Sequence, residues 1–193
     1  NFDIRKTLMK FDNVLNDQRQ VIFSQRNDVM NSGEIFEYSQ VFLDEVIEDL
    51  IQLKSKNLSN PSSNDFTSKL KIIKGKNLVE DEFNKLVSMK DNDLRNEIYE
   101  QFKKSREERK EILGEQQSKE IEKRIFLQSI DINWKSHIQY LEQLRQVIGL
   151  RSYGQRDPLV EYKKESFSLF ENLLEKIRQD IIFLLLNIKI VNQ

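Results

Sequence analysis

Residues 127–148 read LQSIDINWKSHIQYLEQLRQVI, and the spacing of their apolar side chains decides the fold class. Apolar residues recur here at intervals of three and four, which is the period of one face of an α-helix. The face consists of Leu127, Ile130, Trp134, Ile138, Leu141, Leu144 and Ile148. The segment therefore predicts a long amphipathic helix, and we expect Gly149 to end it.

A second long helix is expected to begin at Asp157-Pro158. Asp accepts hydrogen bonds from free backbone N–H groups, and Pro suits the first helical position because it has no N–H to leave unpaired. Two helices of about thirty residues each, joined by so short a connection, must fold back as an antiparallel hairpin with its tip at 149–158. Its second apolar stripe runs through Leu159, Tyr162, Phe167, Phe170, Leu174, Ile177, Ile181, Leu184 or Leu185, and Ile188.

The N-terminal segment predicts another long helix, from Ile4 to Asn31. Apolar residues recur every seven positions. Ile4 and Phe11 form a neighbouring row, which Gln18 and Gln25 continue as polar residues. The row of seven consists of Leu8, Leu15, Ile22 and Val29. We expect Gly33 to end this helix in the left-handed conformation that glycine tolerates.

Shorter helices are expected in the middle of the chain, with Gly114 as the last interruption. Only 5 Gly and 2 Pro occur in 193 residues, which favours an all-α fold. We expect helices near 34–56, 79–88 and 91–113, the last capped by Asp91 or Asp93, a loop at 57–65, and no clear assignment for 66–78. The second of these helices buries Ile35, Val41 or Phe42, Val46, Leu50 and Leu53. The expected organisation is a long scaffold helix (1–31), an inserted helical lobe (32–114), and the hairpin with its C-terminal helix (115–193).

Composition limits the function. A net charge of −1 argues against a globally basic nucleic-acid binder, and the absence of cysteine excludes disulfides and thiolate metal sites. The longest apolar run, 181–186, is too short to span a bilayer. The chain begins at Asn1 rather than Met, which we interpret as a sign that it is part of a longer protein.

No enzyme signature is found. Gly149 and Gly154 have the spacing of a phosphate-binding loop, but the Lys and Ser/Thr that such a loop needs are absent. His137 is the only histidine and cannot form a zinc site without further ligands. We expect His137 and Trp134 to be packing residues within the helix. The charged runs 107–111 and 120–124 are interpreted as solvated helix faces with local ion pairs.

The hairpin tip is the strongest candidate for function. Three arginines and no acidic residue occur from Arg145 to Arg156, and Tyr153 lies between Ser152 and Gly154. An exposed Tyr at the end of a rigid hairpin can contact an apolar or peptide surface. The periodicity leaves this reading equal to another, in which Tyr153 covers the end of the hairpin core.

Two blocks of sequence resemble the SecA family of bacterial preprotein translocase ATPases. The N-terminal block resembles the start of its long scaffold helix, and the C-terminal block resembles its two-helix finger and the finger tip. The matching stretches are NFDIRK at 1–6, DNVLNDQR at 12–19, SQRN at 24–27, DINWKSH at 131–137, LR at 144–145 and LRSYGQRDPLVEYK at 150–163. The insert matches the helical wing of that family by position and helical character only.

The resemblance implies a role that periodicity could not show. In this family the finger enters the cytoplasmic mouth of the SecYEG channel, and its tip tyrosine contacts the unfolded preprotein. Tyr153 is then the substrate-contact residue, with Leu150 and Arg151 beside it. Asp17, Gln18 and Arg19 match the stretch that faces the motor domains. The finger region is also associated with restraint of ATP hydrolysis.

The resemblance also implies what this chain lacks. Ser152 and Val147 stand where the family usually has Gly. Ser152 stiffens the tip slightly, because Ser is less free than Gly at positive φ. Nothing resembles the phosphate-binding loop of the motor, so this part is expected to be non-catalytic, with no metal or cofactor of its own. ATP and magnesium would be bound by motor domains elsewhere. The expected partners are SecYEG, the preprotein, and the motor and preprotein-crosslinking domains of the same protein.

That protein would lie in the bacterial cytoplasm and peripherally on the inner membrane. Two other hypotheses remain. The first is a free-standing helical adaptor that binds partner helices through its exposed seam. The second is an independent enzyme, or a nucleic-acid binder that uses the tip arginines; the near-neutral charge and the motif search argue against it.

Overall fold

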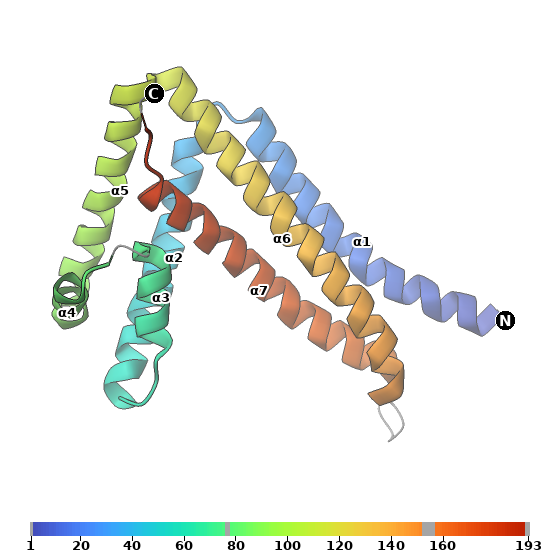
Figure 1. The fold of residues 1–193 in the computed structure, drawn as a ribbon. Coiled ribbons are helices and arrows are strands. Elements are labelled where there is room, and N and C mark those ends of the chain that lie inside the picture. Colours follow the sequence, from blue (N-terminus) through green and yellow to red (C-terminus); the bar gives the residue numbers. More distant parts are fainter. Residues whose placement is uncertain (1, 76–77, 152–156, 192–193) are drawn as a thin grey trace. The chain divides into compact units, whose positions relative to one another are not determined.

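The computed structural model describes residues 2–75, 78–151 and 157–191, and within them the chain is all helical (Figure 1). The prediction of an all-α fold is confirmed. The helices are α1 (Phe2–Asn31), α2 (Ile35–Ser59), α3 (Asp65–Lys74), α4 (Glu80–Ser88), α5 (Asp91–Leu113), α6 (Glu115–Arg151) and α7 (Pro158–Asn187).

The chain divides into two compact units. Unit 1 contains residues 1–32 and 126–177, and unit 2 contains residues 33–125 and 178–193. The two longest C-terminal helices, α6 and α7, each contribute to both units. The first turns of α6 and the last turns of α7 thus belong to the same unit as the helices of the insert. This unit extends beyond residues 32–114, the range expected for the inserted lobe.

Unit 1 is built from α1 packed along the hairpin segments of α6 and α7. The buried row of α1 consists of Phe11, Gln18, Ile22 and Val29. Leu8, expected in this row, is exposed. The facing row of α6 is Ile130, Trp134, Leu141, Leu144 and Ile148, with Leu127 and Ile138 partly buried. The predicted face of residues 127–148 is therefore the face that packs.

The expected stripe of α7 is wrong at one position. Phe167 is exposed, whereas its neighbour Ser166 is completely buried. The buried row of α7 in unit 1 passes through Tyr162, Ser166, Leu173 and Ile177, and Phe167 lies about 100° around the helix from Ser166. Ser166 tolerates burial because its hydroxyl donates to the Lys163 carbonyl at 3.1 Å.

Several helix ends differ from the expectations. Gly149 does not end α6, which continues to Arg151; a single glycine inside a helix costs only about 1 kcal/mol. Gly33 follows α1 but does not adopt the expected left-handed conformation. Among the described glycines, a positive φ is found at Gly75 and Gly114 only. Lys90, rather than Asp91 or Asp93, occupies the N-cap position of α5, and it makes no side-chain cap.

The predicted start of α7 is confirmed. The Leu159 backbone N–H donates to the Asp157 carboxylate at 3.0 Å, and Pro158 is the first helical residue. The predicted interruption at Gly114 is also confirmed, since this residue separates α5 from α6 with a φ of +81°.

Unit 2 has its own apolar core. Its residues come from α2, α3, α5 and the end of α7, and they include Leu43, Val46, Ile47, Leu50, Phe66, Leu70, Ile73, Leu94, Ile98, Phe102, Ile182 and Leu185. Of the alternatives at 41–42, Val41 is exposed and Phe42 is partly buried. The unassigned segment 66–78 supplies α3.

The interpretation of both charged runs as solvated faces is wrong for two residues. Arg109 of the first run and Glu122 of the second are buried, with 1% of each residue exposed. They lie on opposite sides of the Gly114 corner and form an ion pair. A charged run of five residues extends more than one turn, so one member can face inward when a partner of opposite charge meets it there.

Candidate functional site

The candidate site is the end of the α6–α7 hairpin. The structure describes α6 up to Arg151 and the chain again from Asp157. Leu150, predicted to contact substrate, has 73% of its surface exposed on the last turn of α6. Tyr153 and the side chain of Arg151 lie outside the described residues, so their roles stay predictions.

An apolar cluster braces the hairpin just behind its tip. Phe11 of α1 packs against Leu141, Leu144 and Ile148 of α6 and Tyr162 of α7. The rings of Phe11 and Tyr162 meet edge to face, with centroids 4.8 Å apart and planes at 70°. Such pairs add roughly 0.5–1.5 kcal/mol beyond area burial. Three helices therefore share one cluster within about three turns of the end of α6.

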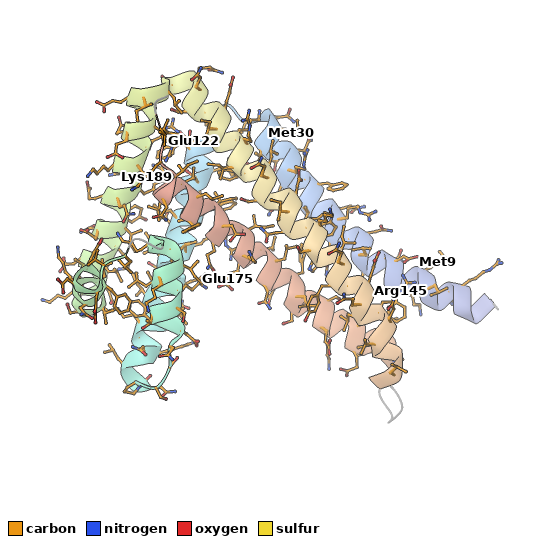
Figure 2. All side chains as sticks on the ribbon, in the orientation of Figure 1. Met9, Met30, Glu122, Arg145, Glu175 and Lys189 are labelled. Carbon is orange, nitrogen blue, oxygen red and sulfur yellow. The ribbon has the colours of Figure 1, made fainter. Side chains whose placement is uncertain are left out.

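Arg145 strengthens this contact. Its Nη1 donates to Asp12 Oδ1 at 2.8 Å, and its guanidinium lies 5.7 Å from the centre of the Phe11 ring. Figure 2 labels Arg145 on α6. Burial raises the pKa of the neighbouring Tyr162 phenol, which keeps that side chain neutral. One arginine thus combines an ion pair with a cation–π contact to α1.

A buried hydrogen-bonded group, here called the polar seam, lies further along the same helices. It consists of Gln18, His137 and Ser166. Gln18 Nε2 donates to the Ser166 carbonyl at 3.1 Å, and Gln18 Oε1 lies 2.7 Å from His137 Nε2. With the amide in this orientation, the neutral ring carries its hydrogen on Nε2 and donates to Gln18. The seam connects α1, α6 and α7 through two hydrogen bonds.

His137 is neutral in this setting. Burial lowers its pKa to about 4, because a desolvated imidazole resists protonation. Its ring lies 5.5 Å from Trp134 and 5.9 Å from Phe170, centroid to centroid. The structure therefore places His137 and Trp134 as packing residues of unit 1.

The three residues proposed to face the motor do not share one environment. Gln18 is only 8% exposed, and both ends of its amide are used inside unit 1. Its side chain therefore points away from any external partner, in contrast to the expectation. Asp17 is exposed and Arg19 is partly exposed, so these two remain accessible.

A second charged contact holds the other end of α1. Arg26 Nε and Nη2 donate to the two carboxylate oxygens of Asp131 at 2.8 and 3.1 Å. This paired geometry fixes orientation as well as distance. Sequence reasoning did not predict this contact, although Arg26 and Asp131 both occur in the matched stretches.

The hairpin also carries a groove that α1 does not line. It has a volume of about 340 Å³ and is lined by Tyr140, Gln143, Leu144, Val147, Glu165, Ser168 and Leu169. Within the described residues, no group of three potential metal-binding side chains occurs. None of the described helices is both long and apolar enough to span a membrane.

Comparison with known proteins identifies the family of the chain. A family model described as "SecA Wing and Scaffold domain" matches residues 1–189. The chain belongs to the SecA wing and scaffold family. It is 60% identical over 193 residues to the protein translocase subunit SecA of Pelagibacter ubique (strain HTCC1062). That match covers 100% of this chain and 23% of the SecA relative.

Proposed function

We propose that this chain is the non-catalytic coupling part of a SecA preprotein translocase. ATP-driven movement of motor domains would reach an unfolded preprotein through the α6–α7 hairpin, which would enter the SecYEG channel with Tyr153 at its tip. ATP and magnesium would be held by the motor domains. The whole protein would work in the bacterial cytoplasm and peripherally at the cytoplasmic face of the inner membrane.

The bracing of the hairpin by α1 carries this proposal. A part that transmits movement must be stiff, and two helices joined only to each other would bend. Here α1 contacts the hairpin through the Arg26–Asp131 pair, the polar seam, and the Arg145–Asp12 pair beside the Phe11 cluster. These contacts follow one another along α1 for about four turns. Only the last turns of the hairpin extend beyond them.

Asp17 and Arg19 are proposed to contact the motor domains. They lie on α1 next to Gln18, whose buried amide fixes the face that α1 turns toward the hairpin. A movement received at Asp17 and Arg19 would then pass directly into the seam. Replacing Gln18 would loosen α1, whereas replacing Arg19 would remove only the outer contact.

The test separates transport from ATP hydrolysis. In the full-length translocase that carries this chain, Tyr153→Ala is expected to reduce preprotein transport at least fivefold while basal ATP hydrolysis changes less than twofold. Tyr38→Ala in α2 makes the same substitution at an exposed tyrosine of unit 2 and serves as the matched control. Unchanged transport in Tyr153→Ala, or an equal loss in both variants, would rule out the tip assignment.

A further inference from the structure

A buried ionic cluster lies at the Gly114 corner of unit 2. We call it the arginine–glutamate joint: Arg106 and Arg109 of α5 with Glu122 of α6. The side chains of Arg109 and Glu122 are 1% exposed, and that of Arg106 is 7% exposed. Figure 2 shows Glu122 near the start of α6, beside α5. The joint has no counterpart in the expected organisation of the chain.

One carboxylate serves both guanidinium groups. Arg109 Nη2 donates to Glu122 Oε2 at 3.2 Å, and Arg106 Nη1 donates to Glu122 Oε1. The Arg106 guanidinium also lies 4.6 Å from the centre of the Phe36 ring on α2. Two positive charges and one negative charge are therefore enclosed together.

The joint also holds the end of α7. Arg109 Nη1 donates to the Leu185 carbonyl at 2.8 Å and to Ser105 Oγ at 2.9 Å. Ser105 Oγ in turn donates to the same carbonyl at 2.7 Å. Because Leu185 lies in the last turn of α7, its carbonyl has no partner within the helix. Arg109 and Ser105 supply the missing donors.

This arrangement is a poor way to gain stability. Removing two guanidinium groups and a carboxylate from water costs about as much as their attraction returns, and apolar replacements of similar volume are often neutral or stabilising. Burial lowers the pKa of Arg109, which is the sign of that cost. In the described part of the chain, Nε of both arginines is buried without a hydrogen-bond partner.

The joint instead restricts the relative placement of three helices. A guanidinium presents its donors in a rigid planar fork, so Arg109 satisfies Glu122, Ser105 and the Leu185 carbonyl in only one relative placement of α5, α6 and α7. An apolar contact would permit α7 to move by part of a turn with little loss. Both α6 and α7 continue from here into the hairpin.

We propose that the arginine–glutamate joint is a register device, which sets the axial position of the end of α7 against α5 and α6 and adds little net stability. A slip of one residue would carry the Leu185 carbonyl about 1.5 Å along the axis and turn it about 100° away from Arg109. The joint therefore selects one register from several of similar apolar burial.

The test compares two segments of unit 2 by hydrogen exchange and mass spectrometry on the full-length protein. In the variant Arg106→Met/Arg109→Met/Glu122→Leu, amides of residues 183–188 are expected to exchange at least tenfold faster than in the wild type. Amides of 43–51 in α2, which report the stability of the core, are expected to change less than threefold. Arg109→Lys keeps the charge but not the fork, and it is expected to give the same pattern.

Two outcomes would overturn the proposal. If residues 183–188 keep their wild-type exchange in both variants, the charges do not set the register. If 43–51 and 183–188 accelerate equally in both variants, the joint contributes stability rather than register. Glu115→Gln, which removes the exposed contact to Lys119 at 3.9 Å, is the control and is expected to leave both segments unchanged.

Discussion

Each compact unit buries a polar cluster, but the polar seam of unit 1 is neutral and the arginine–glutamate joint of unit 2 is ionic. In the seam, Gln18 donates to one partner and accepts from another, and no charge needs to be balanced. In the joint, two guanidinium groups depend on the single carboxylate of Glu122. The difference teaches that similar burial carries different risks: loss of one member of the neutral cluster leaves uncharged polar groups unpaired, whereas loss of Glu122 leaves two buried charges uncompensated.

The largest effect is expected for Glu122→Gln. It leaves two buried guanidinium groups without a counter-charge, and breaking a buried pair in this way costs about 3–5 kcal/mol. Urea unfolding of the 193-residue chain followed by far-UV circular dichroism should show unit 2 unfolding at lower urea. Trp134 is the only tryptophan and belongs to unit 1, so the urea midpoint of its fluorescence should decrease less.

The exposed pair Glu115–Lys119 gives the control for that comparison. Glu115→Gln should change the free energy of unfolding by less than about 0.5 kcal/mol, because exposed pairs contribute little. Equal small effects from Glu122→Gln and Glu115→Gln would remove the distinction between a buried and an exposed carboxylate here.

Acid is expected to act on the seam through His137. Its pKa is about 4 in the folded protein, below the ordinary 6.5, so between these values the unfolded chain binds a proton that the folded chain does not. The contribution of His137 to the free energy of unfolding is therefore fully present above pH 6.5. It is lost as the pH falls toward 4, by about 1.4 kcal/mol per pH unit and by about 3 kcal/mol in all.

The measurement is the urea midpoint of Trp134 fluorescence at pH 7, 5.5 and 4.5. Carboxylates also titrate in this range, so the decisive quantity is the difference between the wild type and His137→Gln. His137→Gln should be less stable at pH 7 but should lose less stability on acidification. Parallel pH profiles for the two proteins would show that His137 is not the source of the slope.

Gln18→Leu should have an intermediate effect. It leaves the Ser166 carbonyl and His137 Nε2 without their partner, which costs about 1–3 kcal/mol in a buried neutral setting. Gln20→Leu on the exposed face of the same helix is the matched control. Trp134 fluorescence in urea measures both. A Gln18→Leu loss as large as that of Glu122→Gln would contradict the ordering of neutral and ionic clusters.

Apart from the exposed-residue controls, the smallest effects should come from substitution of the glycines that follow α1 and α5. Gly114 has a φ of +81° and open space around an added Cβ, so Gly114→Ala should cost unit 2 about 1–2 kcal/mol through backbone strain alone. Gly33 lacks a positive φ and also has open space, so Gly33→Ala should be neutral or slightly stabilising. Urea unfolding followed by circular dichroism measures the effects of Gly114→Ala and Gly33→Ala on the free energy of unfolding. Equal effects would refute the explanation from the positive φ of Gly114.

The sequence predicted the helices better than their contacts. The three-and-four spacing of residues 127–148 identified the packing face of α6, because burial of one face imposes that period. The same pattern failed at Phe167, because it ranks residues by hydropathy and could not anticipate that buried Ser166 would meet Gln18. The charged runs failed for a related reason, since a buried Arg109 is possible only with Glu122, which lies across a corner that spacing cannot place.

The candidate site, too, was predicted only in part. Periodicity located the hairpin and its tip, and the resemblance assigned Tyr153 its role, but neither indicated how α1 braces the hairpin. Gln18 shows why: it belongs both to a stretch matched with motor contact and to the buried row of α1. Only the paired distances to Ser166 and His137 decide between these readings.

Photo-crosslinking from the hairpin tip tests the central claim most directly. A photo-activated residue would replace Tyr153 in the full-length translocase, with Tyr38 in unit 2 replaced in a parallel sample, while a preprotein is arrested partway through the channel. The account predicts a covalent adduct with the preprotein from position 153 and none from position 38. An adduct from position 38 with none from 153 would contradict it.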